Sequence, residues 1–232
     1  MNNIYRTWPY ISTPIGVISL SYVFYLIIDN SDKQNYNDYL AKTLGWLLLP
    51  TYMIHQFEEH GIDFKGEKYA FQKFFCNFLG YNDIDKCPGD EKFIFSVNVP
   101  GLYIAGLIAG FLNNIRPIAA GGFAAVILIN ALVHIFGSIK KKQYNPGVVT
   151  SLLLFIPVSI YYFYEMNRIK KLSKLDIGIC LFIGILYHVV LILSLKLVER
   201  NKISHNTMNL INILNGFVPL VSAEFVRLVK TF

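Results

Sequence analysis

Long apolar segments alternate with short polar segments along this chain of 232 residues. Several apolar segments approach the ~20 residues that a helix needs to cross a bilayer core of ~30 Å. The pattern predicts membrane spans at residues 11–28, 39–60, 93–112, 118–139, 148–164 and 177–197. In residues 207–229, asparagines and Glu224 interrupt the apolar positions, so this segment is either a further span or a packed, half-exposed helix. The predicted fold class is all-α, a polytopic transmembrane helical bundle with six to seven spans.

Residues 60–92 break this pattern of spans. Lysines and phenylalanines are interleaved here, which is typical of an amphipathic helix in the headgroup region. A solvated helix packed on the bundle is the alternative. Because the chain shows no repeat, low-complexity tract or linker, residues 1–232 are predicted to form a single membrane-embedded helical domain, with 60–92 as an interfacial or loop insertion.

Composition supports a membrane protein and argues against nucleic-acid binding. The chain is 54% hydrophobic and 16% charged, whereas soluble domains are typically about 45–50% apolar and 25% charged. Its net charge of +6 comes from lysines and arginines in short loops, as expected beside an anionic leaflet. No basic face with interleaved aromatic residues on a soluble module is visible, so we expect no nucleic-acid partner.

The three cysteines show no Cys-x-x-Cys spacing. Cys76, Cys87 and Cys180 are therefore predicted to be packing residues. One alternative stays open, since Cys76 and Cys87 can pair if their segment faces an oxidising compartment.

Two histidines and two glutamates follow directly on an apolar run, in the sequence His55-Gln56-Phe57-Glu58-Glu59-His60. A carboxylate near the bilayer core costs ~2.5–3.5 kcal/mol on insertion scales, so two adjacent glutamates need a reason. On a helix, His55, Glu58 and Glu59 stand at i, i+3 and i+4 and project from one face. A divalent metal takes such imidazole and carboxylate ligands from a single helix. His60 points about 140° away from His55 and returns to the group only if the helix ends there.

A second polar pair, Asn130 and His134, stands at i and i+4 near the end of the span 118–139. This span runs in the same direction as the span 39–60, because one crossing separates them. Both polar groups therefore reach the same leaflet at similar depth. The sequence predicts that His134 lies within one metal's reach of the glutamates in the first group.

These residues resemble the HXXEE-domain family of polytopic membrane proteins. The His-x-x-Glu-Glu motif is His55-Gln56-Phe57-Glu58-Glu59. The Asn-x-x-x-His element is Asn130-Ala131-Leu132-Val133-His134, and the Tyr-x-Pro-Gly element is Tyr144-Asn145-Pro146-Gly147, with Thr150 shortly after. Order and approximate spacing agree over residues 40–164. The resemblance implies which motifs belong together and names no reaction.

Two kinds of metal site are compatible with these residues. In the first, His55, Glu59 and His134 bind one divalent ion, and Glu58 acts as the base for a bound water. In the second, Glu58 and Glu59 bridge a pair of ions. Zinc, iron and manganese all remain candidates, because the sequence contains neither a His-Glu-x-x-His motif nor the Glu-x-x-His pair of di-iron bundles.

Other polar residues are candidates for supporting roles. Tyr144 is a candidate catalytic phenol on the same side of the membrane. Asn130, His60 and Asn98 are candidates for substrate binding or for orienting a metal ligand. His188, alone in the span 177–197, is predicted to make an interhelical hydrogen bond.

The charges of the loops favour a cytoplasmic site. Lysines at 65–92 and 140–142 follow the two spans that carry the polar groups, although basic residues at 168–174 lie on the other side. Under the positive-inside rule the polar groups are expected on the cytoplasmic side.

The expected function is a metal-dependent integral membrane enzyme acting on a lipid or other amphiphilic small molecule near one leaflet. Hydrolysis is expected first and oxygen chemistry at a two-metal site second. The alternative is a membrane transporter or ligand-binding protein whose His/Glu group binds an ion or relays protons. A third possibility is a partner of other membrane proteins in which the group serves structure only.

Overall fold

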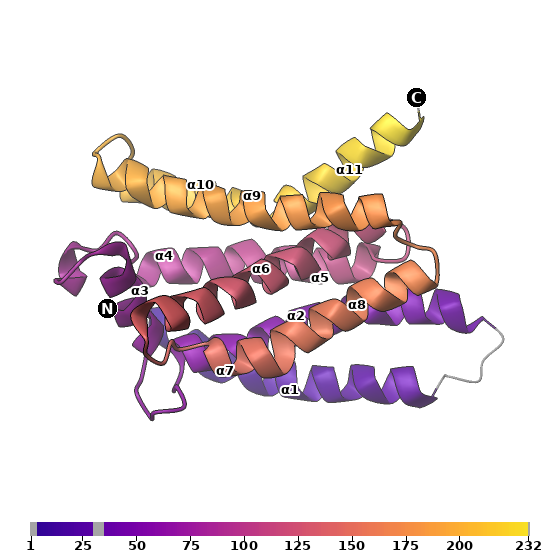
Figure 1. Cartoon of the computed structure of the whole chain (residues 1–232), viewed down its shortest axis with the longest axis horizontal. Helices are drawn as coiled ribbons and strands as arrows, with labels where there is room; N and C mark the ends of the chain where they lie inside the picture. Colours follow the sequence, from indigo (N-terminus) through magenta and orange to yellow (C-terminus); the bar gives the residue numbers. More distant parts are fainter. Residues whose placement is uncertain (1–3, 30–34, 232) are drawn as a thin grey trace.

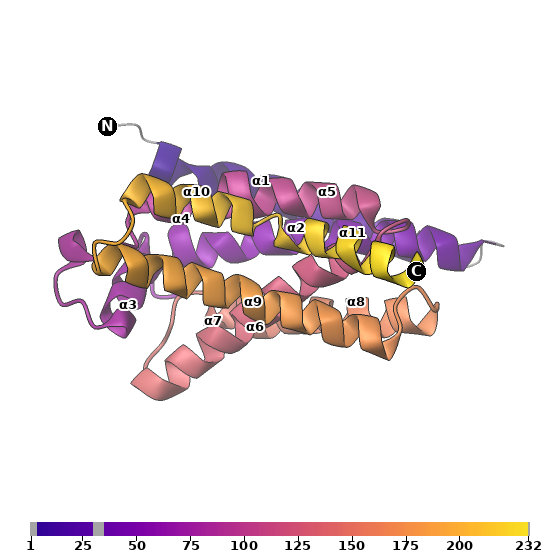
Figure 2. The ribbon, with the colours of Figure 1, turned by 90° about the horizontal axis from the view of Figure 1, so that it is seen from above.

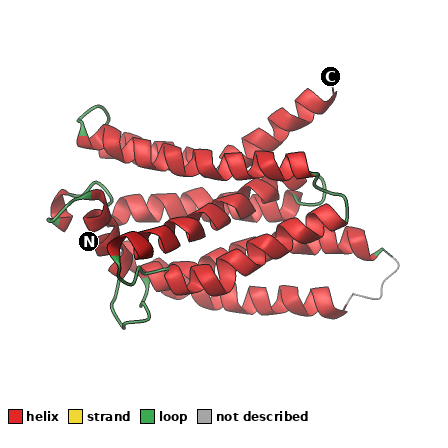
Figure 3. Ribbon diagram, viewed as in Figure 1, coloured by secondary structure: helices red, strands yellow, loops and turns green. Residues whose placement is uncertain are grey.

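The computed structural model describes residues 4–29 and 35–231. Helices make up most of the described chain, and loops connect them at the two ends of the bundle (Figure 3). The described residues form no strand, and Ile62 and Lys68 form an isolated bridge. The predicted all-α fold class is therefore confirmed.

The helices run back and forth along the long axis of the molecule (Figure 1). In chain order they are α1 (Ile4–Asp29), α2 (Tyr36–His60), α3 (Ala70–Leu79), η1 (Ile84–Lys86), α4 (Glu91–Ser96), η2 (Val97–Tyr103), α5 (Ile104–Leu112), α6 (Pro117–Lys141), α7 (Val148–Thr150), η3 (Ser151–Phe155), α8 (Ile156–Arg168), α9 (Lys174–Glu199), α10 (His205–Asn215) and α11 (Val218–Thr231). The π-helical stretch η2 joins α4 to α5, and the π-helical stretch η3 joins α7 to α8. Each set forms one continuous span.

Within the described ranges, five spans are long and apolar enough to cross a membrane: Ile4–Asp29, Glu91–Leu112, Pro117–Lys141, Val148–Arg168 and Lys174–Glu199. The pair α10 and α11, bent by 47°, adds a sixth if it crosses as one span. α2 lies alongside these helices but is less apolar, because it carries the His/Glu group (Figures 1 and 2). The protein is a multi-pass membrane protein, as predicted.

The predicted segment 207–229 consists of two helices rather than one. Gly216 lies against the backbone of Gly101, and a Cβ on Gly216 would meet the Gly101 carbonyl carbon at 2.7 Å. Pro219, in the first turn of α11, has no N–H with which to continue a helix from α10. The close crossing and the missing donor explain why the chain bends here.

α2 lies in the centre of the bundle, in contact with α1, α5, α6 and α8. Its consecutive residues Leu47, Leu48, Leu49 and Pro50 are all buried, and because neighbouring helical residues point about 100° apart, they cover more than one face of the helix. Protein therefore surrounds α2, so its polar last turn faces other helices rather than lipid.

One end of the molecule collects the polar elements. The C-terminal ends of α2 and α6 and the N-terminal end of α7 meet where α3 lies, which we call the α3 end (Figure 1). α1 begins at this end, whereas α11 ends at the opposite end (Figures 1 and 2). The structure thus gives α2 and α6 the same direction, as the order of the spans predicts.

α3 is amphipathic, and its aromatic face is turned inward. Phe71, Phe74, Phe75 and Phe78 line an internal cavity, whereas Lys73 is exposed on the other side. Since α3 packs against α2, it covers the interior of the bundle at this end.

Cys76 in α3 and Cys87 form a disulfide, and Cys180 is free and buried. The prediction that Cys76 and Cys87 are unpaired packing residues is therefore wrong, and their pairing is confirmed. The reason is local: α3 ends at Gly80, in the left-handed conformation, and the chain returns until the two Cα atoms are 5.8 Å apart.

Candidate functional site

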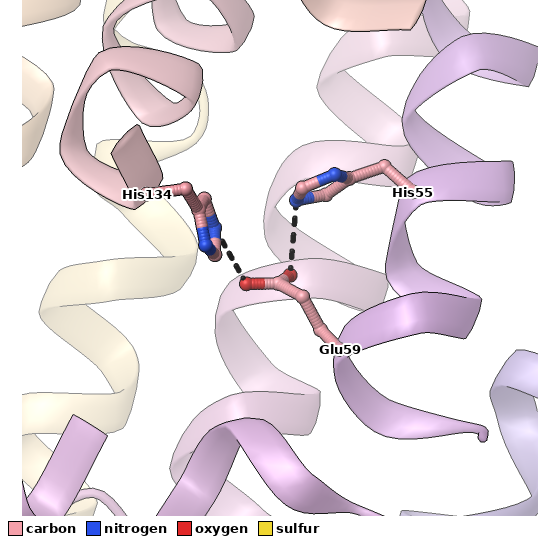
Figure 4. Close-up of side chains that lie close together, drawn as sticks. All are labelled: His55, Glu59 and His134. Atoms are coloured by element: carbon pink, nitrogen blue, oxygen red, sulfur yellow. Dashed lines mark ion pairs between the residues drawn. The ribbon is translucent and has the colours of Figure 1, made fainter. Parts of the chain in front are cut away.

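His55, Glu59 and His134 lie together at the α3 end, brought there by α2 and α6 (Figure 4). Each offers one possible ligand atom, and these atoms lie within 4.8 Å of one another. His134 Nε2 is 2.9 Å from Glu59 Oε1, and His55 Nε2 is 3.5 Å from Glu59 Oε2. All three side chains are buried. The spacing i, i+4 in α2 and the parallel course of α6 produce this group, which we call the His/Glu cluster.

His60 approaches the cluster from the last residue of α2. The helix ends at Gly61, and His60 Nε2 lies 3.5 Å from Glu59 Oε2. The rings of Tyr69 and Phe71 pack on His60 at centroid distances of 5.4 and 5.5 Å. His60 Nδ1 is buried and has no hydrogen-bond partner within the described chain. Glu59 therefore faces three imidazoles.

Glu58 forms hydrogen bonds outside the cluster, at the N-terminal end of the continuous helical span made of α7, η3 and α8. Its Oε1 accepts hydrogen bonds from Tyr144 Oη at 2.8 Å and from the Val149 N–H at 3.1 Å. Its Oε2 accepts from the N–H of Thr150 at 2.7 Å and from the Thr150 hydroxyl. A carboxylate is unfavourable near the negative C-terminal end of the α2 dipole, and the positive N-terminal end of the span that begins with α7 offsets this effect. Glu58 is therefore not part of the group formed by His55, Glu59 and His134.

Thr150 connects Glu58 to His55. The Thr150 hydroxyl donates its proton to the Glu58 carboxylate, so its 2.8 Å contact with His55 Nδ1 needs a proton from the imidazole. Nδ1 therefore carries a proton, and in the neutral imidazole Nε2 keeps its lone pair. This Nε2 is turned toward Glu59 (Figure 4) and has no hydrogen-bond partner among the residues described. Histidines that bind metals commonly donate a hydrogen bond from one ring nitrogen and bind the metal through the other. His55 has this arrangement.

Gly147 lies directly against both histidine rings. Its φ of +99° is in the left-handed region, which favours glycine. A Cβ here would meet His134 Cε1 at 2.6 Å and His55 Cε1 at 3.0 Å. From sequence alone, Gly147 is a simple turn residue; in the structure it also lets the turn before α7 reach the cluster.

Tyr144, predicted as a catalytic phenol, contacts Glu58 and not the cluster. Its oxygen also accepts a hydrogen bond from the Phe64 N–H at 3.3 Å, and Lys65 Nζ lies 5.2 Å from the ring centroid. Burial raises the pKa of the Tyr144 phenol, which therefore keeps its proton and donates it to Glu58. The catalytic role of Tyr144 stays a prediction.

An internal cavity of about 150 Å³ borders the cluster. It follows α6 from Val126 to Gly137, about 16 Å of helix at 1.5 Å per residue, and α4, η2 and α9 form its other walls. The phenylalanines of α3 close the α3 end. Most of the lining is apolar, and Glu59, His60 and His134 supply a polar group near the α3 end.

A polar hollow of about 890 Å³ lies outside the cavity at the α3 end. Arg6, Lys65, Lys68 and Lys73 contribute positive charge to it. His60 and Phe74 line both the hollow and the cavity, so these two side chains form the partition between them.

The predicted residues Asn130 and Asn98 both line the cavity but differ in their bonding. Asn98 accepts a hydrogen bond from Tyr52 Oη and donates one to the Ile94 carbonyl at 2.9 Å. Asn130 Oδ1 is buried without a partner within the described ranges, so it is free to bind a polar group in the cavity.

Two polar residues of α9, Tyr187 and His188, also line this cavity. The Tyr187 hydroxyl is buried and has no partner in the described chain, and sequence reasoning missed it because nothing distinguishes it from the other tyrosines. His188 Nδ1 donates to the carbonyl of Gly184 in its own helix at 2.8 Å, so the predicted interhelical bond is not the one formed by this nitrogen.

The family description "Protein of unknown function with HXXEE motif" matches residues 46–162, half of the chain. The chain belongs to the HXXEE family. No curated protein and no solved structure matches it. The resemblance read from the sequence motifs is therefore confirmed.

The two glutamates of the HXXEE motif have different partners in this fold. Glu59 joins His55 and His134 in the cluster, while Glu58 binds the segment that follows Gly147. The matched region thus contains the whole cluster, whereas α9, which supplies Tyr187 to the cavity, lies beyond it.

Proposed function

We propose that this protein is a metal-dependent membrane enzyme in which His55, Glu59 and His134 bind one divalent cation. The free lone pair of His55 Nε2, fixed by the Thr150 hydrogen bond and directed at a buried carboxylate, is the observation that carries the proposal. Ligand atoms around a tetrahedral zinc are about 3.3 Å apart, given bonds of about 2.0–2.1 Å. The contacts of 2.9 and 3.5 Å are close to that value.

The ligand set favours zinc and a catalytic rather than a structural site. Two imidazoles and one carboxylate leave a fourth position for water, as in catalytic zinc sites. A cation held by these residues would lower the pKa of a bound water to about 7 and so would supply a nucleophile at neutral pH. Iron and manganese are the next candidates, because the same ligands suit them.

The bonding of Glu58 supports one cation rather than two. A bridging carboxylate would need free oxygens, and both oxygens of Glu58 already accept hydrogen bonds from Tyr144, Val149 and Thr150. We therefore assign Glu58 the role of holding Thr150, and through it His55, in place. Tyr144 takes part in the same support.

The spaces on either side of the cluster support an amphiphilic substrate. The cavity is largely apolar and has a volume of about 150 Å³, and an engineered apolar cavity of ~150 Å³ holds benzene. An apolar group of about that size fits beside Glu59, while a polar head group fits the hollow, provided that the partition of His60 and Phe74 opens to join the two spaces. We propose hydrolysis of the bond that joins the two parts.

A substrate panel tests this function. The protein is purified in detergent and incubated with esters and amides that link a short apolar group to a polar head. We expect hydrolysis that chelator abolishes and added zinc restores. His134→Ala should remove it, while His205→Ala, a change at an exposed residue that begins α10, should not.

Two results would contradict the proposal. Hydrolysis that survives both chelator and His134→Ala would locate the activity elsewhere. Ion flux through reconstituted protein that depends on Glu59, with no turnover of any panel member, would support the transporter instead.

A further inference from the structure

The Cys76–Cys87 disulfide lies on one side of the membrane, together with the His/Glu cluster. Both cysteines belong to the segment between α2 and α4, and the two helices run in opposite directions (Figure 1). The whole segment is therefore at the α3 end. The Gln72 amide donates to the Gly89 carbonyl at 3.3 Å, so a hydrogen bond reinforces the same junction.

This disulfide has the character of a structural bond. Cys76 is 1% exposed and Cys87 is 4% exposed, so solvent reductants have little access to either sulfur. The phenylalanines at 71 and 75, in the same helix as Cys76, stack on each other and cover the cavity. The disulfide thus holds α3 in the position in which its phenylalanines cover the cavity beside the cluster.

Structural disulfides form and persist in oxidising compartments and are rare where glutathione and thioredoxin keep thiols reduced. We infer that the α3 end, with the His/Glu cluster and the polar hollow, faces an oxidising extracytoplasmic compartment. A polar substrate group then reaches the cluster from that side. This inference does not rest on the proposed enzymatic function.

The inference reverses the expectation from loop charges. Basic residues occur at both ends: Lys140, Lys141 and Lys142 lie at the α3 end, and Arg168 and Lys171 lie at the opposite end. Since neither end is free of positive charge, the positive-inside rule discriminates weakly here. The disulfide depends directly on the compartment, so we give it more weight.

The orientation can be measured with an impermeant maleimide on intact cells. In a Cys180→Ser background that keeps the disulfide, Lys202→Cys places a thiol on the exposed loop between α9 and α10, at the α3 end. The matched variant Lys174→Cys places one at the exposed start of α9, at the opposite end. We expect labelling of Lys202→Cys in intact cells and labelling of Lys174→Cys only after permeabilisation.

A thiol count on the same membranes provides the second readout. The Cys180→Ser protein, denatured without reductant, should show no free thiol, and the thiols of Cys76 and Cys87 should appear after reduction. Labelling of Lys174→Cys but not Lys202→Cys in intact cells would overturn the inference. So would free thiols at Cys76 and Cys87 before reduction.

Discussion

The hydroxyl of Thr150 determines which nitrogen of His55 carries the proton. Because the hydroxyl proton is donated to Glu58, His55 must donate from Nδ1 and keep Nε2 free. Thr150→Val removes the hydroxyl at nearly constant shape. We expect a loss of about 10–100-fold in zinc affinity, as is typical when a group that orients a ligand is removed.

Competition titration with a zinc chelator measures this affinity. Thr150→Ser keeps the hydroxyl and should keep most of the affinity. Thr51→Val is the matched control, since among the described residues the buried Thr51 hydroxyl bonds only to the Leu47 carbonyl of its own helix. Equal zinc affinity in Thr150→Val and Thr51→Val would show that Thr150 does not orient a metal ligand.

Gly147 allows a second test at the scale of one residue. Gly147→Ala should lower both stability and zinc content, because a Cβ would collide with His134 and His55. Gly80→Ala is the control: it has a similar φ of +97° but no atom within 4 Å of the added Cβ. Left-handed strain of about 1–2 kcal/mol is common to both variants.

Denaturation curves and metal analysis of these two variants separate strain from contact. We expect Gly80→Ala to lower stability and keep its zinc, whereas Gly147→Ala loses zinc as well. Full zinc content in Gly147→Ala would mean that the rings are not held in the arrangement described.

At this scale, helical periodicity predicted part of the site. The i, i+4 spacing correctly placed His55 beside Glu59. It also placed Glu58 on the same face, but adjacent helical residues differ by about 100° in direction, and the N–H groups of α7 bind the Glu58 carboxylate instead. That partner lies 91 residues away, which a local pattern cannot reveal.

Among the elements, α3 depends most on a single bond. Cys76→Ser with Cys87→Ser removes a cross-link across a separation of 11 residues, and the chain-entropy estimate for such a loop is about 3 kcal/mol. We expect a lower unfolding midpoint for the double variant. Tryptophan fluorescence during denaturation in detergent measures it.

Reductant serves as the control for this prediction. It should lower the midpoint of the wild-type protein toward that of the double variant, and it should leave the double variant unchanged. A wild-type midpoint that does not respond to reductant under denaturing conditions would contradict a stabilising role for the bond.

The elements themselves were largely predictable. Apolar runs identified the five spans of the described chain, because a bilayer-crossing helix needs a long apolar segment. They also predicted a span at 39–60, and the corresponding helix α2 is not among the five. Their ends were less certain: α1 begins at Ile4, seven residues before the predicted position 11. Aromatic and polar residues occupy that first part: Trp8 is buried against His60 at the α3 end, whereas Arg6 and Tyr10 are exposed.

For the whole molecule, the order of the spans was the most useful information in the sequence. Counting the crossings predicted that α2 and α6 run in the same direction and that His134 lies near Glu59, and in the structure these two residues belong to one cluster. The cavity could not be predicted in this way, because the contribution of α9 depends on how helices pack sideways. Small residues permit that packing, as where Gly184 lies against the backbone of Ala125.

The same view of the whole molecule explains why one cluster can be both buried and accessible. α2 is central, so its last turn is shielded from lipid, yet it ends close to the polar hollow at the α3 end. A buried carboxylate is costly unless hydrogen bonds or a positive charge compensate it. A hydrogen bond donated by His134 Nε2, which lies 2.9 Å from Glu59 Oε1, would meet this requirement, as would a metal ion, and metal analysis distinguishes the two.

The most direct test of the metal centre is the metal content of protein purified in detergent without chelator and then equilibrated with zinc. We predict about one tightly bound ion per chain, with nitrogen and oxygen ligands by X-ray absorption. His55→Ala/Glu59→Gln/His134→Ala should lose the ion while His205→Ala keeps it. A folded wild-type protein that binds no divalent metal, or a triple variant that binds as much as the wild type, would contradict the account.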